Sequence, residues 1–170
     1  IKYYIKNDYI FVSPDDILNG LDPTKNHILI TFDDGYYNNQ LALPILKKYD
    51  VPALFFISSN HIKQNKCFWW DVIYRQRINQ GFDKDEISIE IESLKDRKNS
   101  EIENYIIIKF GKNALNPLSD IDRPFTPDEL KKFAKNQHVF IGNHTTNHAI
   151  LTNYSLDEVR EEIDNSQNSI

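Results

Sequence analysis

A short apolar run that ends in two acidic residues is the feature that most constrains how this chain can fold. Residues 27–30 (HILI) are aliphatic and partly β-branched, which is typical of a buried strand in a parallel sheet. The run continues into TFDDG, where Gly35 supplies the turn that ends the strand. Because neighbouring side chains on a strand point to opposite faces, Asp33 and Asp34 can meet at one site only if the backbone bends there.

Two carboxylates at the end of a buried strand are costly unless they are paired or bind a metal. Taken alone, Asp33 and Asp34 are better explained as loop residues that cap the next helix. A second motif changes this interpretation, because HTTNH follows another short apolar run at residues 139–141. If the motif formed one helical turn, His144 and His148 would share a face. Two histidines and one carboxylate are the protein ligands of an open zinc site, which leaves one position for water.

The two motifs together resemble those of the polysaccharide deacetylases, the NodB-homology family of carbohydrate esterases. TFDDG at residues 31–35 is similar to the first motif of that family, and HTTNH at residues 144–148 is similar to its second motif, H-[ST]-x-x-H. Residues 39–57 also resemble the segment that follows the first motif. Tyr36 stands where many members have proline, a departure that we expect to have little bearing on the chemistry. The resemblance runs from about residue 10 to the end, apart from an insertion.

The resemblance implies a function and a role for each candidate residue. It implies a metal-dependent hydrolase that removes N-acetyl groups from an amino-sugar polysaccharide or glycan of the cell envelope. Asp34, His144 and His148 would hold a divalent metal, expected to be zinc, and Asp33 would be the general base that takes a proton from water. The expected partner is therefore an N-acetylated glycan. A cell-envelope or secreted location is implied by the family alone, since no cleavable signal peptide is visible.

The order of the expected elements predicts an α/β fold with parallel strands. A strand at residues 27–32, a helix at 39–49 and a strand at 52–57 form a β-α-β unit with a right-handed crossover. In that helix, Leu41, Ile45 and Leu46 are expected to face inward. A further strand is expected at residues 139–141.

The family resemblance narrows this prediction to a partial, deformed (β/α) barrel of the NodB-homology type. Such barrels take about 250 residues, whereas this chain has 170 and its last residue lies within an expected helix. We therefore expect residues 1–170 to be the N-terminal portion of a deacetylase domain, with an insertion at about residues 62–125. The later family motifs, which supply a base-tuning arginine, an oxyanion donor and a general-acid histidine, would lie beyond residue 170. The chain alone is accordingly expected to be poorly active.

Local patterns predict the remaining elements. Residues 3–12 alternate loosely and are expected to form an edge strand. Residues 87–91 alternate isoleucine with polar residues, as in a half-exposed strand. Helix starts are expected at four capping residues, which are Ser13, Ser100, Thr126 and Ser155.

Composition excludes several classes of partner. The net charge of −5 and the pI near 5.5 argue against nucleic acid as a partner. No apolar run approaches the roughly 20 residues that a membrane span needs. Cys67 is the single cysteine, so the chain has no internal disulfide.

Three other groups of residues resemble functional features, but each is better explained by a structural role. The aromatic segment at residues 68–71 (FWWD) could form a platform for a sugar, but packing in a core is the commoner role of such rings. His27 and His61 are expected to be structural. The RPF segment at residues 123–125 resembles a third family motif, but it precedes the histidine motif instead of following it. We interpret it as a loop before the helix that starts at Pro127.

Other functions fit the motifs less well. A metalloprotease of the HExxH type would need glutamate where Thr145 stands. An iron oxygenase with two histidines and one carboxylate fits the ligand set but leaves Asp33 without a role. The remaining alternative is a module that binds a metal or a sugar without turnover.

Overall fold

Three parallel strands form the centre of the structure, a computed structural model that describes all residues 1–170. They are β3 (Ile30–Phe32), β4 (Ala53–Ile57) and β5 (Val139–Asn143), and they lie in the order β3-β4-β5. The register pairs Phe32 with Phe55, which pairs in turn with Ile141. The carboxyl ends of all three strands therefore meet at one edge, as the sequence predicts.

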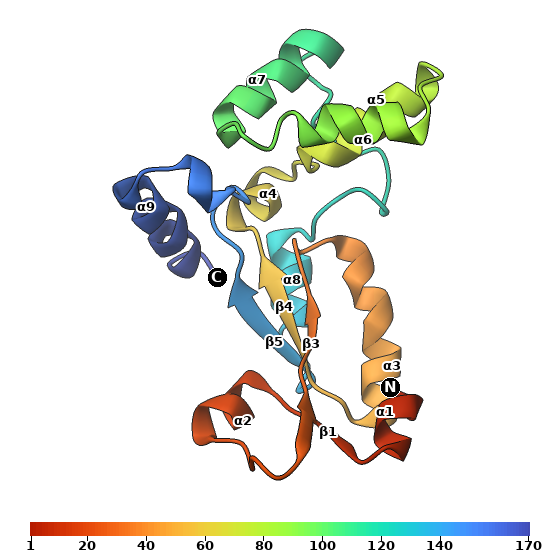
Figure 1. The fold of residues 1–170 in the computed structure, drawn as a ribbon, viewed down its shortest axis with the longest axis vertical. Helices are drawn as coiled ribbons and strands as arrows, with labels where there is room; N and C mark the ends of the chain where they lie inside the picture. The colour runs from red at the N-terminus through yellow and green to blue at the C-terminus, as the bar shows by residue number, and fades with distance from the viewer.

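The N-terminal residues form a separate two-stranded parallel sheet, which lies beyond the amino ends of β3, β4 and β5 (Figure 1). It contains β1 (Tyr9–Phe11) and β2 (Asn26–Ile28), flanked by α1 (Lys2–Lys6) and α2 (Pro14–Asn19).

Two expectations for this region are wrong. The first half of the expected edge strand at residues 3–12 is helical, and the helix places the ring of Tyr4 edge-on against those of Tyr9 and Phe11. The single strand expected at residues 27–32 is two strands, because the chain passes at Leu29 from one sheet to the other.

Helices cover one face of the three-stranded sheet. On that face lie η1 (Tyr37–Ala42), α3 (Leu43–Tyr49) and α8 (Pro127–Phe133), which pack against the buried side chains of β4. Leu46 is buried as expected, but Leu41 and Ile45 are 73% and 51% exposed. The expected helix begins as the 3-10 helix η1 and continues as α3. The face that packs on the sheet core contains Ala42, Leu43, Leu46 and Tyr49, at spacings of one to three residues, and Leu41 and Ile45 lie outside it.

A layer of helices at the carboxyl edge of the sheet has a hydrophobic core of its own (Figure 1). It contains α5 (Trp69–Asn79), α6 (Lys84–Glu92) and α7 (Asn99–Phe110), and α4 (Ser59–Gln64) leads into it from β4. Its ten buried core residues are Cys67, Trp69, Val72, Ile73, Ile87, Leu94, Ile102, Ile106, Ala114 and Leu115. This layer occupies most of the segment that we interpret as an insertion.

Two expectations for this layer are also wrong. The half-exposed strand at residues 87–91 is helix α6, in which Ile87 and Ile91 lie four positions apart and pack towards the core while Ile89 is exposed. Helix α7 begins after Lys98 instead of Ser100, because the carboxylate of Glu101 accepts the backbone N–H of Lys98.

The other predicted helix starts are confirmed. Ser13, Thr126 and Ser155 each form a capping box, at the starts of α2, α8 and α9 (Leu156–Gln167). A short 3-10 helix, η2 (Leu151–Asn153), precedes α9. No helix has the length and apolar character that crossing a membrane requires.

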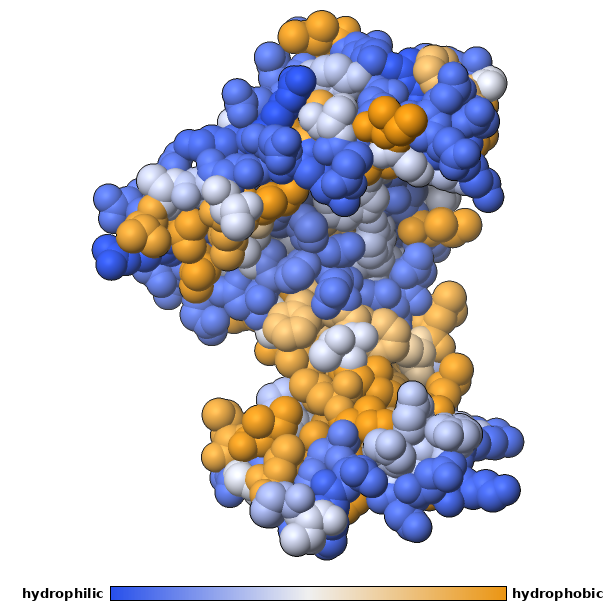
Figure 2. All heavy atoms as spheres, in the orientation of Figure 1, coloured by the Kyte–Doolittle hydropathy of each residue, from blue (hydrophilic) through white to orange (hydrophobic).

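The strands form two open sheets, so the described residues contain no closed barrel. The second face of the three-stranded sheet is only partly covered. Leu54 and Phe56 of β4 point to that face and remain half-buried, whereas Ala53, Phe55 and Ile57 are buried on the other. Figure 2 shows the resulting apolar surface at the narrow middle of the molecule.

Candidate metal centre

The TFDDG segment ends β3 in a sharp turn. Asp34 and Gly35 both adopt left-handed backbone conformations, with φ of 74° and 84°. The N–H of Gly35 donates to the carbonyl of Asp33 at 2.9 Å, which closes the turn. A Cβ at Gly35 would lie 3.1 Å from Cδ1 of Ile57, so glycine also allows the close approach to β4. The backbone bend that the paired aspartates require is therefore present, and it begins at Asp34 itself.

The HTTNH segment leaves β5 as an irregular loop, which corrects the expected helical turn. Thr145 and His148 have φ of 64° and 54°, which no helix allows. The side-chain oxygen of Asn143 accepts the N–H of Thr145 at 2.8 Å, and Oγ1 of Thr145 accepts the N–H of Ala149 at 3.0 Å. These bonds fold the loop back on itself, so that the rings of His144 and His148 lie 4.7 Å apart.

The two motifs meet at the carboxyl edge of the sheet. Oδ1 of Asp34 lies 2.9 Å from Nε2 of His148 and 3.3 Å from Nε2 of His144. The three ligand atoms all lie within 4.8 Å of one another. In a tetrahedral zinc site with bonds of about 2.0–2.1 Å, ligand atoms are separated by about 3.4 Å. One carboxylate oxygen and two imidazole nitrogens therefore fit a divalent ion after a small adjustment.

The charge state of Asp34 also suits a ligand. Burial raises the pKa of this carboxyl, but hydrogen bonds and charge interactions with His144 and His148 outweigh that effect and hold it well below its usual value. Asp34 is therefore ionised at neutral pH, as metal binding requires.

Asp33 lies beside this cluster but not within it. Its side chain is exposed and takes no part in the ion pairs of Asp34 with the histidines. Its backbone carbonyl also accepts the Nδ2–H of Asn39 at 3.3 Å, which helps to fix the start of the turn. The structure thus places Asp34 with His144 and His148 in one cluster of candidate metal ligands, called the ligand cluster below. The carboxylate of Asp33 lies outside this cluster and is exposed to solvent.

Aromatic residues from the helical layer form a wall against His148. The rings of Trp70 and Phe68 lie 4.8 and 5.6 Å from the imidazole of His148, both edge-on. Phe68 is fully buried and Trp69 nearly so, which agrees with the packing role, whereas Trp70 is half-buried at the site. His61 is buried and stacks on Phe68, as expected for a structural histidine.

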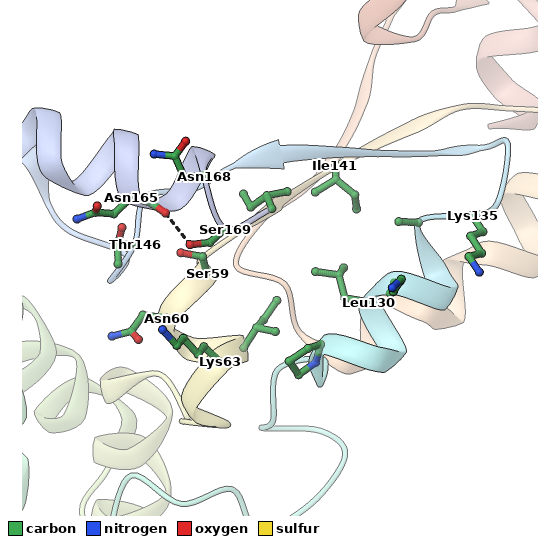
Figure 3. A pocket seen from close by; sticks show the side chains of 15 residues that line it. Ser59, Asn60, Lys63, Leu130, Lys135, Ile141, Thr146, Asn165, Asn168 and Ser169 are labelled. Atoms are coloured by element: carbon green, nitrogen blue, oxygen red, sulfur yellow. Dashed lines mark hydrogen bonds between the residues drawn. The ribbon is translucent and has the colours of Figure 1, made fainter.

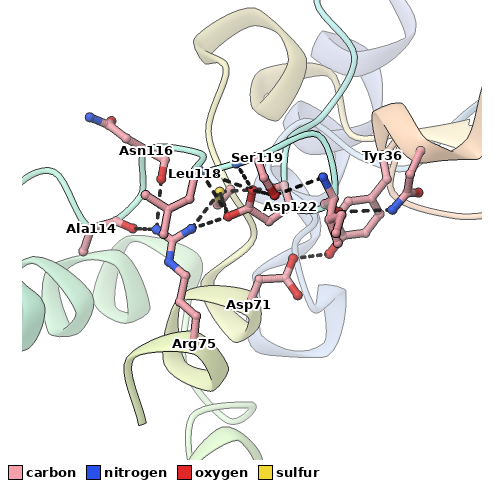
Figure 4. A network of polar contacts seen from close by, with 11 residues as sticks. Tyr36, Asp71, Arg75, Ala114, Asn116, Leu118, Ser119 and Asp122 are labelled. Carbon is pink, nitrogen blue, oxygen red and sulfur yellow. Dashed lines mark hydrogen bonds and ion pairs between the residues drawn. The ribbon is translucent and has the colours of Figure 1, made fainter. Parts of the chain in front are cut away.

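The structure gives Tyr36 a role that sequence reasoning missed. Its hydroxyl donates to Oδ2 of Asp71 at 2.5 Å (Figure 4). The same hydroxyl accepts the Nε1–H of Trp70 at 3.1 Å. Burial, with the hydrogen bond to Asp71, raises the pKa of this hydroxyl far above its ordinary value. Tyr36 thereby ties the first motif to the helical layer, which proline at this position could not do. No sequence signal pairs these two residues, because they lie 35 positions apart in the chain.

The RPF segment packs directly on the first motif. The carbonyl of Arg123 accepts the N–H of Tyr37 at 3.0 Å, and the N–H of Phe125 donates to the carbonyl of Gly35 at 3.1 Å. The guanidinium of Arg123 lies 3.4 Å above the ring of Tyr37 and pairs with Glu129. The segment is thus a loop before α8, as interpreted, and it also supports the turn at Gly35.

Two hollows lie near the carboxyl edge of the sheet. The larger, of about 1030 Å³, lies between α4, α8, β5 and the end of α9, and none of the three clustered residues lines it (Figure 3). The smaller, of about 480 Å³, is lined by His144 and His148 together with Ile163 and Gln167 of α9. The smaller hollow is therefore the one that matters for chemistry at the cluster.

Comparisons with known proteins are consistent with this site. The family model for polysaccharide deacetylase matches residues 20–170. A Bacillus subtilis protein called putative polysaccharide deacetylase YxkH is 36% identical over 67 residues, which cover 36% of this chain and 24% of that protein. An uncharacterized 30.6 kDa protein of Geobacillus stearothermophilus is 23% identical over 145 residues, which cover 84% of this chain and 31% of that protein.

The fold is similar to that of a solved structure, the Streptococcus pyogenes deacetylase PplD in complex with acetate. The TM-score is 0.56 at 18% sequence identity, and the match covers 98% of this chain and 51% of that one. The chain thus spans about half of that structure and about a third or less of the two curated relatives. Because the sequence identity is only 18%, the similarity to this structure is evidence for a shared fold alone.

Proposed function

The chain belongs to the polysaccharide deacetylase family, and we propose that it carries the metal centre of a hydrolase that removes N-acetyl groups from an amino-sugar glycan of the cell envelope. One observation carries the proposal, which is the convergence of Asp34, His144 and His148 at the carboxyl edge of the sheet. The two motifs that supply these residues are distant in the sequence and meet only through the parallel pairing of β3, β4 and β5.

We propose that Oδ1 of Asp34 and the Nε2 atoms of His144 and His148 hold one divalent ion, with zinc as the expected metal. The set of one carboxylate and two imidazoles leaves a coordination position for water, as in catalytic zinc sites. When bound, such an ion polarises a carbonyl group and lowers the pKa of water towards about 7. Trp70 and Phe68 restrict the orientation of the His148 ring, which favours a fixed direction for its nitrogen.

In this proposal Asp33 is the general base. Its exposed carboxylate is not engaged by the two histidines, so it can accept a proton from the attacking water. The water oxygen adds to the acetyl carbon, the carbon–nitrogen bond breaks, and the nitrogen leaves with a proton as the free amine. The products are acetate and a glucosamine-type sugar. Acetate is also the ligand of the solved deacetylase that shares the fold, which is consistent with this product.

The test is release of acetate by the metal-loaded protein that contains this chain. Chitin oligomers and bacterial envelope glycans are suitable substrates, and released acetate is measured by a coupled assay. The proposal expects release that a chelator abolishes and that added zinc restores.

Two other outcomes would contradict the proposed reaction. Bound metal without acetate from any glycan would favour the module that binds a metal or sugar without turnover. Bound iron together with oxygen consumption would indicate an oxygenase.

A further inference from the structure

Helix α9 fastens the HTTNH loop from outside the ligand cluster. Glu162 lies on α9 and is only 9% exposed, which is unusual for a carboxylate. It is not part of either motif, and neither His144 nor His148 contacts it in an ion pair.

Four hydrogen bonds join Glu162 to the two residues between Thr145 and His148. Its backbone carbonyl accepts from the N–H and the Oγ1–H of Thr146, at 3.0 and 2.9 Å. Its carboxylate accepts from Asn147 with both oxygens, since Oε2 lies 2.8 Å from the backbone N–H and Oε1 lies 2.6 Å from Nδ2. A buried carboxylate thus finds in Asn147 two of the donors that it needs.

The remaining polar atoms of Asn147 are also engaged. Its Oδ1 accepts from Nδ2 of Asn60 at 2.7 Å, and its backbone carbonyl accepts from Nδ2 of Asn99. Asn60 belongs to α4 and Asn99 to α7, so the loop is held from three helices at once. Glu162 is the one charged partner in this set, and bonds to a charged group are the stronger ones.

The loop needs such support because its backbone is strained. Thr145 and His148 both have positive φ, a conformation that is unfavourable for any residue other than glycine. Asn147 directly precedes His148 in the chain. The two hydrogen bonds between Asn147 and the carboxylate of Glu162 therefore fix the backbone position from which the His148 side chain extends. Without them the loop can relax, and the imidazole of His148 would no longer be aligned with Asp34.

We propose that Glu162 is a positioning residue for the metal centre, which sets metal affinity by holding Asn147 and thereby the approach of His148 to Asp34. The inference rests on the proposed function, because it assumes that Asp34, His144 and His148 bind a metal. It adds a requirement that neither sequence motif contains, namely that α9 must be docked for the ligands to be aligned. Outer residues that orient metal ligands typically change affinity by about 10- to 100-fold when they are replaced.

The experiment measures Zn²⁺ affinity by competition with a chromophoric chelator, for the wild type, Glu162→Gln and Asn147→Ala. Glutamine keeps the volume of Glu162 but can accept only one of the two N–H groups of Asn147, so we expect affinity to fall about 10-fold or more. Glu161→Gln is the matched control, since Glu161 is the exposed neighbour on the same helix. The Zn²⁺ affinity of this variant should stay within about twofold of the wild-type value.

Two further readouts separate positioning from a loss of stability. The absorption spectrum of the Co²⁺-substituted protein should change in Glu162→Gln, because the ligand geometry around the ion is altered. The double variant with Asn147→Ala should bind Zn²⁺ about as weakly as the weaker single variant, because the two substitutions break the same contact.

The outcomes distinguish this inference from the proposed function. If Glu162→Gln binds Zn²⁺ as tightly as the wild type, Glu162 does not position the site, although the metal site stands. If its affinity falls only in proportion to a loss of metal-free thermal stability, with an unchanged Co²⁺ spectrum, its role is structural and the inference is wrong. If the wild type itself binds no Zn²⁺, both the inference and the proposed metal centre fail.

Discussion

Nε2 of His148 lies 2.9 Å from Oδ1 of Asp34, although Asp34 follows β3 and His148 follows β5. Strand β4 lies between these strands and pairs with both of them in parallel, so their carboxyl ends open at the same edge. The contact joins the two sequence motifs in one site. Two of the predictions below concern this site, and two concern the sheet core and the helical layer that flank it.

Replacing His148 by alanine should abolish stoichiometric metal binding. The change removes one of three ligand atoms and leaves Asp34 and His144, which are too few to retain zinc through dialysis. Zinc content, measured by atomic emission after reconstitution, should fall from about one ion per chain to well below it. His27→Ala is the control, because His27 lies in β2 of the other sheet. Undiminished zinc in His148→Ala would exclude this ligand assignment.

Replacing Asp33 by asparagine should separate metal binding from turnover. The side chain of Asp33 is exposed and outside the ligand cluster, so the variant should bind zinc as the wild type does. Loss of a general base typically slows a reaction by about 10²- to 10⁴-fold. Zinc content and acetate release should be measured on the same preparation. Loss of zinc from Asp33→Asn would show that this aspartate is a ligand and not the base.

The sequence predicts the sheet and the convergence of the motifs because both depend on local signals with a clear physical basis. Short apolar runs indicate buried strands, and the strand-helix-strand order indicates that these strands are parallel, which brings their carboxyl ends together. Asp34, His144 and His148 could therefore be placed at one edge without knowledge of the angles between elements. The capping boxes at Ser13, Thr126 and Ser155 are equally local.

Features that depend on tertiary packing could not be predicted in the same way. The alternation of residues 87–91 fits a strand and a helix alike, and only the core of the helical layer selects the helix. The HTTNH loop is held by Glu162, a residue of α9 that no motif points to. The hydrogen bond of Tyr36 to Asp71 likewise joins two segments whose contact the sequence does not reveal.

Replacing Phe55 by alanine should destabilise the sheet core strongly. Phe55 is fully buried on β4, stacks on Phe32 at 4.7 Å and meets the ring of Phe133 edge-on at 4.8 Å. Deleting such a ring leaves a cavity and costs about 3–5 kcal/mol in the free energy of unfolding. Urea denaturation of the metal-free protein is the measurement. Ile108→Ala is the control, because Ile108 is 78% exposed and should change stability by less than about 0.5 kcal/mol.

The pair of Arg77 and Glu90 should make the helical layer sensitive to acid. Nε of Arg77 lies 2.6 Å from Oε2 of Glu90, which joins α5 to α6. Burial raises the pKa of Glu90, but hydrogen bonds from Arg77, Tyr105 and Lys109 outweigh it and lower the pKa to about 2, from an ordinary value of 4.5. Because the folded-state pKa is depressed, the stabilisation is present above the unfolded-state pKa and is lost as the pH falls towards 2.

The measurement is the free energy of unfolding of wild type and Glu90→Gln between pH 7 and pH 2. The variant does not titrate at this position, so it should be less stable than the wild type at pH 7, by on the order of 2 kcal/mol. The difference should shrink below about pH 5, because the wild type then gains a proton on unfolding that the variant cannot bind. Glu92→Gln is the control on the same helix, since its side chain is 72% exposed and its pairing with Lys95 is screened by solvent. A difference between wild type and Glu90→Gln that does not change with pH would mean that the carboxylate contributes through packing and not through its charge.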